Sequence, residues 1–191
     1  MKEIAELLGR RPPRTVEDPA LKPAAVLVPL FMRGGELHFL MGRRSSQLEH
    51  HAGQVAFPGG ALEKFDRSVE DCALREAEEE VGLKRTDVSI LGRLDDEVTV
   101  TGYRISPLVG TFPYPYPLRL DSAEFTELLQ VPWTVFIDPS LRREETVVYQ
   151  GKQYRVDFYQ FGEHVIWGAT ARITRRLVDL TVHLLNQGGG S

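Results

Sequence analysis

The stretch GQVAFPGGALEKFDRSVEDCALREAEEEVGL, residues 53–83, decides the fold of this chain. Its pattern predicts a strand at Gln54–Phe57, a tight turn at Pro58-Gly59-Gly60 and a helix over Ser68–Val81. Glycine tolerates backbone conformations that other residues resist, so two glycines after a proline favour a sharp turn. The same glycines allow the backbone to pass close to a ligand.

The predicted helix has recognisable start and stop signals. Ser68, with Asp71 three residues later, forms a capping-box pattern at the helix N-terminus. Gly82 follows the last helical residue, where a left-handed C-cap is expected. Cys72 falls inside the helix, and we expect it to be a small buried residue.

Three carboxylates share one face of this helix. Glu76, Glu79 and Glu80 stand at positions i, i+3 and i+4, beside Glu78. Like charges at this spacing repel by a few tenths of a kcal/mol per pair. The cluster therefore indicates either a solvated charged surface or a bound cation. Oxygen ligands without nitrogen or sulfur suit Mg²⁺ or Mn²⁺.

Composition excludes several classes of protein. The chain has 191 residues, of which 42% are hydrophobic and 26% charged, as in ordinary globular domains. A net charge of −4 provides no general attraction to nucleic acid or to an anionic membrane surface. A single cysteine makes no disulfide framework, and no apolar run approaches the ~20 residues of a membrane span. We therefore expect a cytoplasmic protein with no nucleic-acid or membrane partner.

The rest of the chain predicts one domain over residues 1–191, with an N-terminal extension at 1–23 and a flexible tail at 186–191. Helices are expected at Lys2–Leu8 and Ile166–Leu185, and a short helix or turn at Glu124–Gln130. The basic segment RRPPR, residues 10–14, is expected to be a solvated linker. Strands are expected at Ala24–Phe31, Leu37–Gly42, Val88–Leu91, Tyr103–Phe112, Thr146–Tyr149 and Tyr154–Phe161.

Two details of this pattern bear on the sheet. Pro29 cannot donate a ladder hydrogen bond, so it indicates an edge strand or a bulge. Gly34-Gly35 predicts a hairpin turn between the first two strands. Many strands with a few helices favour a mixed sheet packed between helices. The sequence has no His-Glu-x-x-His, paired-cysteine, Gly-x-Ser-x-Gly or Walker pattern, which argues against zinc, serine-nucleophile and P-loop chemistry.

Two segments of the sequence resemble the signatures of a known protein family. REAEEEVGL, residues 75–83, resembles the REUxEExGU half of the Nudix hydrolase box, in which U is an aliphatic residue. The front half is one residue longer than the general box, and its glutamate position is occupied by Asp66 or displaced. Residues 40–60, LMGRRSSQLEHHAGQVAFPGG, resemble the second signature of the coenzyme A pyrophosphatase subfamily, which shares the longer spacing. Glu49 stands where that signature has an arginine.

The resemblance covers about residues 24–185, including Thr101-Gly102-Tyr103, Glu124–Pro132 and Ile166–Thr170. It implies an α/β fold, specifically a Nudix-type α/β/α sandwich with a mixed β-sheet. It also implies metal-dependent hydrolysis of a small-molecule substrate. For the coenzyme A subfamily the products are 3′,5′-ADP and 4′-phosphopantetheine, or its acyl or disulfide form.

The resemblance also implies roles for individual residues. Glu76, Glu79 and Glu80 are the expected ligands of Mg²⁺ or Mn²⁺, which would activate a water for attack on phosphorus. Arg75 is expected to orient a glutamate by ion pairing, and Gly59 and Gly60 to shape the loop beside the metal. The general base is one of the helix glutamates or a carboxylate from another loop. The candidates from other loops are Glu124 and Glu127, ahead of Glu97.

Substrate contacts follow from the chemistry of coenzyme A, whose diphosphate and 3′-phosphate need basic partners. Arg43 and Arg44 are the best placed candidates, followed by Lys64 and Arg67. Tyr103 is a candidate to pack against adenine or pantetheine, whereas Phe57 is expected in the core.

Three alternatives stay open. The chain could hydrolyse another nucleotide such as ADP-ribose, which a substrate panel would reveal. It could be a non-catalytic Nudix-fold binding module, although such modules usually have damaged glutamate clusters and this cluster is intact. Prenyl diphosphate isomerisation shares the fold, but it would require a catalytic cysteine outside the helix that contains Cys72. The oligomeric state stays open as well.

Overall fold

The structure, a computed structural model, describes residues 1–47 and 51–186, with side chains described as far as residue 182. The predictions that fall on Leu48 and Glu49 lie outside the described residues. So does the predicted tail, apart from Asn186, which is the last residue of a helix.

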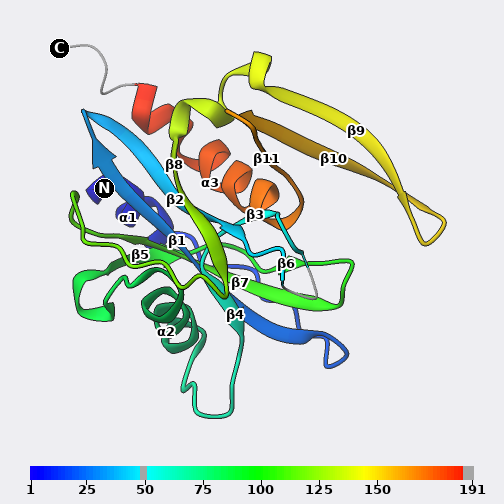
Figure 1. The fold of residues 1–191 in the computed structure, drawn as a ribbon, viewed down its shortest axis with the longest axis horizontal. Coiled ribbons are helices and arrows are strands. Elements are labelled where there is room, and N and C mark those ends of the chain that lie inside the picture. The colour runs from blue at the N-terminus through cyan, green and yellow to red at the C-terminus, as the bar shows by residue number, and fades with distance from the viewer. Residues whose placement is uncertain (48–50, 187–191) are drawn as a thin grey trace.

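Three α-helices and two sheets make up the described chain (Figure 1). The helices are α1 (Lys2–Gly9), α2 (Val69–Val81) and α3 (Gly168–Asn186), with 3₁₀ turns η1 (Arg85–Asp87), η2 (Trp133–Phe136) and η3 (Pro139–Leu141). The strands are β1 (Lys22–Arg33), β2 (Glu36–Arg44), β3 (Val55–Ala56), β4 (Gly59–Ala61), β5 (Ser89–Arg93), β6 (Glu97–Val98), β7 (Tyr103–Thr111), β8 (Phe125–Pro132), β9 (Arg142–Tyr149), β10 (Lys152–Phe161) and β11 (His164–Ile166).

The main sheet is mixed and is built around β1. Its strand order is β3-β2-β1-β7-β5, with β4 paired to β1, β6 to β7 and β8 to β2. β1 runs parallel to β7 and antiparallel to β2, and the Gly34-Gly35 turn joins β1 to β2 as predicted. Because β1 is covered on both faces, its sequence is a nearly continuous apolar run.

Helices cover both faces of the main sheet, so the predicted α/β/α sandwich is confirmed. One core lies between the sheet and α2, and it includes Cys72, Ala77 and Val81. The other core lies on the opposite face with α1 and α3, and it includes Ile4 and Leu177. Figure 1 shows α2 on the far side of the sheet from α3.

Pro29 does not mark an edge strand, because β1 lies between β2 and β7. It falls instead between the residues of β1 that pair with β4, Ala24–Val26, and those that pair with β2, Leu30–Arg33. Pro29 has no N–H to donate, and it lies in a gap between the β4 and β2 ladders, where no donor is needed. Proline is therefore compatible with this internal strand.

Two local predictions on the main sheet are wrong. Gly59 and Gly60 do not form a tight turn but belong to β4, which pairs antiparallel with β1. The segment expected as a short helix or turn at 124–130 is largely β8, whose residues pair with β2. The ring of Phe125 packs where a side chain at Gly42 would otherwise stand, and this contact helps to fix the β2–β8 register.

The RRPPR segment is largely exposed and irregular, as predicted for a solvated linker, but it is anchored to the rest of the chain. The Arg11 guanidinium pairs with Asp95, and the Arg14 N–H donates to the same carboxylate at 2.9 Å. The N–H of Val16 donates to Asp96, whose side chain is fully buried and also pairs with Arg93. These contacts attach the N-terminal extension to Asp95 and Asp96, which directly precede β6.

The second sheet, of order β11-β10-β9, contains the two strands predicted at Thr146–Tyr149 and Tyr154–Phe161. The two expected strands are longer than predicted, and the turn between them is confined to Gln150-Gly151. Figure 1 shows β9 and β10 extending well beyond the main body.

Candidate active site

The sequence of α2 accounts for its ends and its orientation. The Ser68 hydroxyl accepts from the Asp71 N–H at 3.0 Å, and Gly82 ends the helix at φ 69°, both as predicted. Ala73 and Ala77 are fully buried and small, which allows α2 to approach the sheet closely. The helix therefore presents its carboxylates towards β4.

Glu80 is the most buried carboxylate of α2, with 3% of its surface exposed. Its Oε2 accepts a hydrogen bond of 2.9 Å from the N–H of Gly59 in β4. Burial raises the pKa of Glu80 from an ordinary 4.5 to about 8, and the Gly59 hydrogen bond only partly opposes this. A buried carboxylate of this kind is common at functional sites.

Glu76 lies beside Gly60, the second glycine of β4. A Cβ atom at Gly60 would collide with the Glu76 carboxylate, so this position requires glycine. Burial raises the pKa of Glu76, whereas the nearby Arg75 lowers it. The two glycines thus have a definite function in β4, since they bring backbone against the carboxylates of α2.

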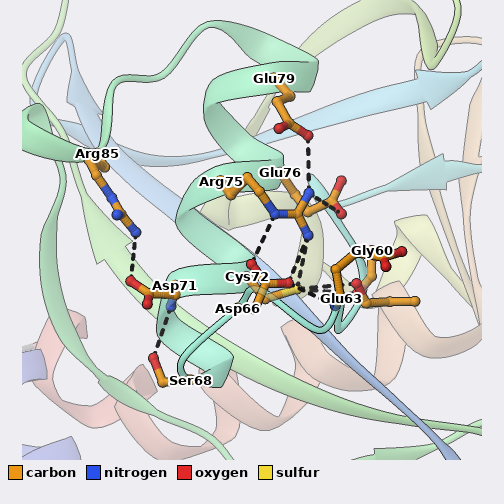
Figure 2. Close-up of polar contacts among 11 residues, drawn as sticks. Gly60, Glu63, Asp66, Ser68, Asp71, Cys72, Arg75, Glu76, Glu79 and Arg85 are labelled. Atoms are coloured by element: carbon orange, nitrogen blue, oxygen red, sulfur yellow. Dashed lines mark hydrogen bonds and ion pairs between the residues drawn. The ribbon is translucent and has the colours of Figure 1, made fainter.

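Arg75 connects the loop before α2 to two of the three carboxylates (Figure 2). Its Nε and Nη2 donate to the two oxygens of Asp66 at 3.0 and 2.9 Å, a bidentate pair. Its Nη1 lies 2.8 Å from Glu76 and 3.0 Å from Glu79. The hydrogen bonds with Asp66 raise the pKa of Arg75, and they lower the pKa of Asp66.

Asp66 is therefore the acidic partner of Arg75 from the loop before α2. Its side chain is 2% exposed, and the Glu63 N–H also donates to it at 2.9 Å. The Asp66 N–H in turn donates to the Glu63 carbonyl at 3.0 Å, so a local turn fixes the position of Asp66 in the loop. Cys72 lies beneath this pair, and burial raises its pKa to about 12, which leaves the thiol protonated and unreactive at neutral pH.

Glu79 is the most accessible member of the cluster, with its side chain 59% exposed. The described residues gather no group of three acidic, histidine or cysteine side chains that could hold an ion as they stand. Arg75 pairs with both Glu76 and Glu79. A cation bound to all three glutamates requires Glu79 to turn away from Arg75.

Of the two expected general bases, the structure brings Glu124 to the helix carboxylates. Its charge raises the pKa values of Glu76 and Glu80, after the larger effect of burial. Arg44 lies 3.4 Å from Glu124, and its charge lowers the pKa of Glu80. The buried Nε of Arg44 has no hydrogen-bond partner among the described residues.

Glu127 faces the opposite side of the sheet. It stands two and four positions before Leu129 and Val131 in β8, so it shares the face of these residues, which are buried in the core under α3. Its carboxylate lies 3.4 Å from Nε2 of His164 in β11. Glu97, the third candidate, pairs with Arg172 and Arg176 of α3 and serves to attach that helix.

The expected substrate contacts are distributed around this centre. Arg43 pairs in register with Glu127 at the end of β2 and is exposed. Lys64 is exposed in the loop before α2, and Arg67 in the same loop is bound to Asp71 at 2.7 Å. Tyr103 lies at the start of β7, with the Lys22 ammonium 5.9 Å from its ring centre.

Sequence reasoning missed Phe65, which is 69% exposed and has the Arg75 guanidinium 5.3 Å from its ring centre. An aromatic residue between Lys64 and Asp66, in a loop of otherwise polar character, was the available signal. The exposed ring limits access of solvent to one side of Arg75.

Comparison with known proteins agrees with this geometry. Residues 21–149 match the NUDIX domain family. The chain is 39% identical over 168 residues to a Photorhabdus laumondii protein described as an uncharacterized Nudix hydrolase NudL, covering 88% of this chain and 89% of that protein. An Escherichia coli protein of the same description is 37% identical over 156 residues, covering 82% and 81%. The chain therefore belongs to the Nudix family, and it is a hydrolase of pyrophosphate bonds.

Solved structures show the same fold at low identity. A crystal structure of a MutT/Nudix family protein from Enterococcus faecalis matches with a TM-score of 0.55 at 16% identity, covering 95% of this chain and 69% of that one. A Deinococcus radiodurans structure matches at 0.56 and 14% identity, covering 84% and 88%. Among the described residues, no helix has the length and apolar character that a membrane crossing requires.

Proposed function

We propose that this Nudix hydrolase cleaves the diphosphate of coenzyme A or a derivative, giving 3′,5′-ADP and 4′-phosphopantetheine or its acyl or disulfide form. The observation that carries the proposal is the joint placement of two sequence signatures. The upstream segment that resembles the coenzyme A subfamily ends in β4, and β4 is hydrogen-bonded to Glu80 of the Nudix helix.

The donor set of α2 fits a hard divalent cation. Nudix hydrolases generally use Mg²⁺ or Mn²⁺, and Glu76, Glu79 and Glu80 offer only carboxylate oxygens. Burial raises the pKa values of Glu76 and Glu80, and neighbouring carboxylates add to this effect, so a cation beside them would favour the charged form of both. When bound, the ion would neutralise diphosphate charge and lower the pKa of a coordinated water.

The chain's own groups would then hold this arrangement in place. Asp66 fixes Arg75, which in turn positions Glu76 and Glu79 when no cation is bound. The Gly59 N–H holds one oxygen of Glu80 and leaves the other available. Glu124 is the outside carboxylate best placed to accept a proton, because it lies close enough to influence the pKa values of both buried glutamates.

Arg44 supports an anionic substrate at the same site. It reaches towards Glu80 and Glu124 with a guanidinium that the described residues do not saturate. An unpartnered buried donor is costly, and a substrate phosphate or a water would satisfy it. Arg43, adjacent and exposed, adds positive charge on the rim.

A substrate panel tests the proposal. We expect hydrolysis of coenzyme A in Mg²⁺ at a higher kcat/KM than hydrolysis of dephospho-coenzyme A or ADP-ribose. Equal rates on coenzyme A and dephospho-coenzyme A would contradict recognition of the 3′-phosphate. Preference for ADP-ribose would establish the alternative substrate, and no turnover of any diphosphate would indicate a binding module.

Two matched variants test whether Arg44 contributes to binding of coenzyme A. Arg44→Lys keeps the charge but removes the planar guanidinium, and we expect a raised KM for coenzyme A. Arg33→Lys is the control, because Arg33 pairs with Gln130 and lies in register with Glu36 at the end of β2 away from Arg44. An identical effect of both substitutions would contradict a substrate role for Arg44.

A further inference from the structure

The hairpin of β9 and β10 has an amphipathic pattern that neither core explains. Val147 lies opposite Tyr154 in the ladder, and this register places alternate residues of both strands on a common face. The hairpin leaves the main body at its base, where Tyr159 packs against Phe136, and extends away from it (Figure 1).

One face of the hairpin carries apolar residues along its length, interspersed with the charged residues Arg143, Glu145 and Lys152. Its apolar stripe consists of Val147, Tyr149, Tyr154, Val156, Phe158 and Trp167. Trp167 stacks on Phe158 at the base, with the ring centres 5.9 Å apart. Tyr149, Tyr154 and Trp167 are each between 37% and 39% exposed, so the stripe faces outward.

The opposite face of the hairpin is polar. Its members are Glu144, Thr146, Val148, Gln153, Arg155 and Asp157. Arg142 and Asp157 pair there at 2.8 Å. Because charged side chains are readily solvated, this face requires no protein partner.

The apolar stripe lies outside both cores as far as the described residues show. Two-stranded ribbons are at best marginally stable alone in water, and a contiguous exposed apolar patch with aromatic residues marks an interaction surface. A partner layer on the stripe would stabilise a hairpin that the rest of the chain supports only at its base.

We infer that the apolar stripe is the interface of a homodimer with twofold symmetry. Three charged residues, Arg143, Glu145 and Lys152, lie on the same face, and the last two favour a second copy as the partner. Glu145 precedes Val147 by two positions, and Lys152 precedes Tyr154 by two positions on the antiparallel strand. Glu145 and Lys152 therefore lie on opposite sides of the Val147–Tyr154 pair, measured along the strands. Arg143 holds Glu145 at 2.7 Å within the hairpin, but both side chains are more than half exposed, so this pair can exchange.

We place the twofold axis in the plane of the interface, perpendicular to the strands, at the Val147–Tyr154 pair. This axis brings Lys152 of one copy to the same height along the strands as Glu145 of the other. The reverse pair forms by symmetry. The same axis places Tyr149 of one copy at the level of Val156 in the other. Apolar contact and charge are thus complementary in a single arrangement.

The size of the hairpin sets the expected strength. Eight residues of β9 span about 26 Å at ~3.3 Å per residue, and a ribbon of this length covers less than the roughly 800 Å² per partner of a standard interface. We therefore expect a dimer that dissociates on dilution.

Sedimentation velocity from ~1 to ~200 µM protein, a range in which such a weak dimer dissociates, tests the inference. We expect monomer at low and dimer at high concentration for the wild type. Glu145→Lys and Lys152→Glu should each abolish the dimer, and the double variant should restore it. Val148→Lys, on the polar face beside Tyr149, is the matched control and should dimerise normally.

Circular dichroism checks that the variants are folded, and Tyr154→Glu provides an independent disruption of the apolar contact. A wild type that is monomeric at every concentration would overturn the inference and leave the stripe to another partner. The inference would also be overturned if Tyr154→Glu or Glu145→Lys dimerised as strongly as the wild type, or if the double variant stayed monomeric.

Discussion

Glu80→Gln offers the most detailed test of how the site is built. The structure gives Glu80 a pKa of about 8 against an ordinary 4.5, because its carboxylate is buried under β4. Between these pH values the metal-free folded protein binds a proton that the unfolded chain has released. The free energy of unfolding must therefore fall as the pH rises through this window.

The magnitude follows from the size of the pKa shift. One pH unit corresponds to about 1.4 kcal/mol, so ionisation of Glu80 lowers the free energy of unfolding by up to about 5 kcal/mol at pH 8. The substituted glutamine cannot ionise, yet its amide oxygen can still accept from the Gly59 N–H. The variant should lose this pH dependence while keeping the hydrogen bond.

Urea unfolding at several pH values between ~5 and ~8, with chelator present, measures the difference. We expect the wild type to lose stability relative to Glu80→Gln as the pH rises. Glu78→Gln is the control, because Glu78 is exposed on the same helix, and its difference from the wild type should stay flat. A wild-type minus Glu80→Gln difference that does not change with pH would refute the buried, proton-binding Glu80.

Three further predictions concern the surroundings of that carboxylate. Asp66→Asn should lower kcat roughly 10- to 100-fold by releasing Arg75, with partial recovery in Asp66→Glu, as steady-state kinetics would show; unchanged kcat would remove Asp66 from the positioning of Arg75. Gly60→Ala should displace Glu76 and raise the Mg²⁺ concentration needed for half-maximal activity; an unchanged Mg²⁺ titration would contradict this. Ser68→Ala should cost about 1 kcal/mol of stability through loss of the helix cap, with the Mg²⁺ titration unaffected; a thermal melt identical to wild type would contradict the cap assignment.

The chain's helix signals allowed much of the site to be predicted from sequence. The α2 caps at Ser68 and Gly82 depend on local hydrogen bonds, so they were readable without tertiary contacts. The common face of Glu76, Glu79 and Glu80 follows from helix periodicity alone. The layered architecture followed from alternating apolar segments and from the family resemblance.

Features that depend on tertiary pairing were not predictable. Gly59-Gly60 has the composition of a turn, but its pairing with β1 makes it strand β4. The segment after Glu124 has helix-forming residues, and only its pairing with β2 makes it β8. The separation of Glu124 from Glu127 depends on the same strand, because alternation sends Glu127 to the α3 face. Burial of Glu80 likewise requires the position of β4.

Product analysis of coenzyme A hydrolysis in Mg²⁺, for wild type and Glu80→Gln, tests the central claim most directly. We predict that the wild type releases 3′,5′-ADP and 4′-phosphopantetheine and that the variant loses most of this activity while remaining folded. Equal activity in Glu80→Gln would contradict the assignment of the metal site to α2. A wild type that leaves coenzyme A intact but cleaves another nucleotide diphosphate would contradict the proposed substrate.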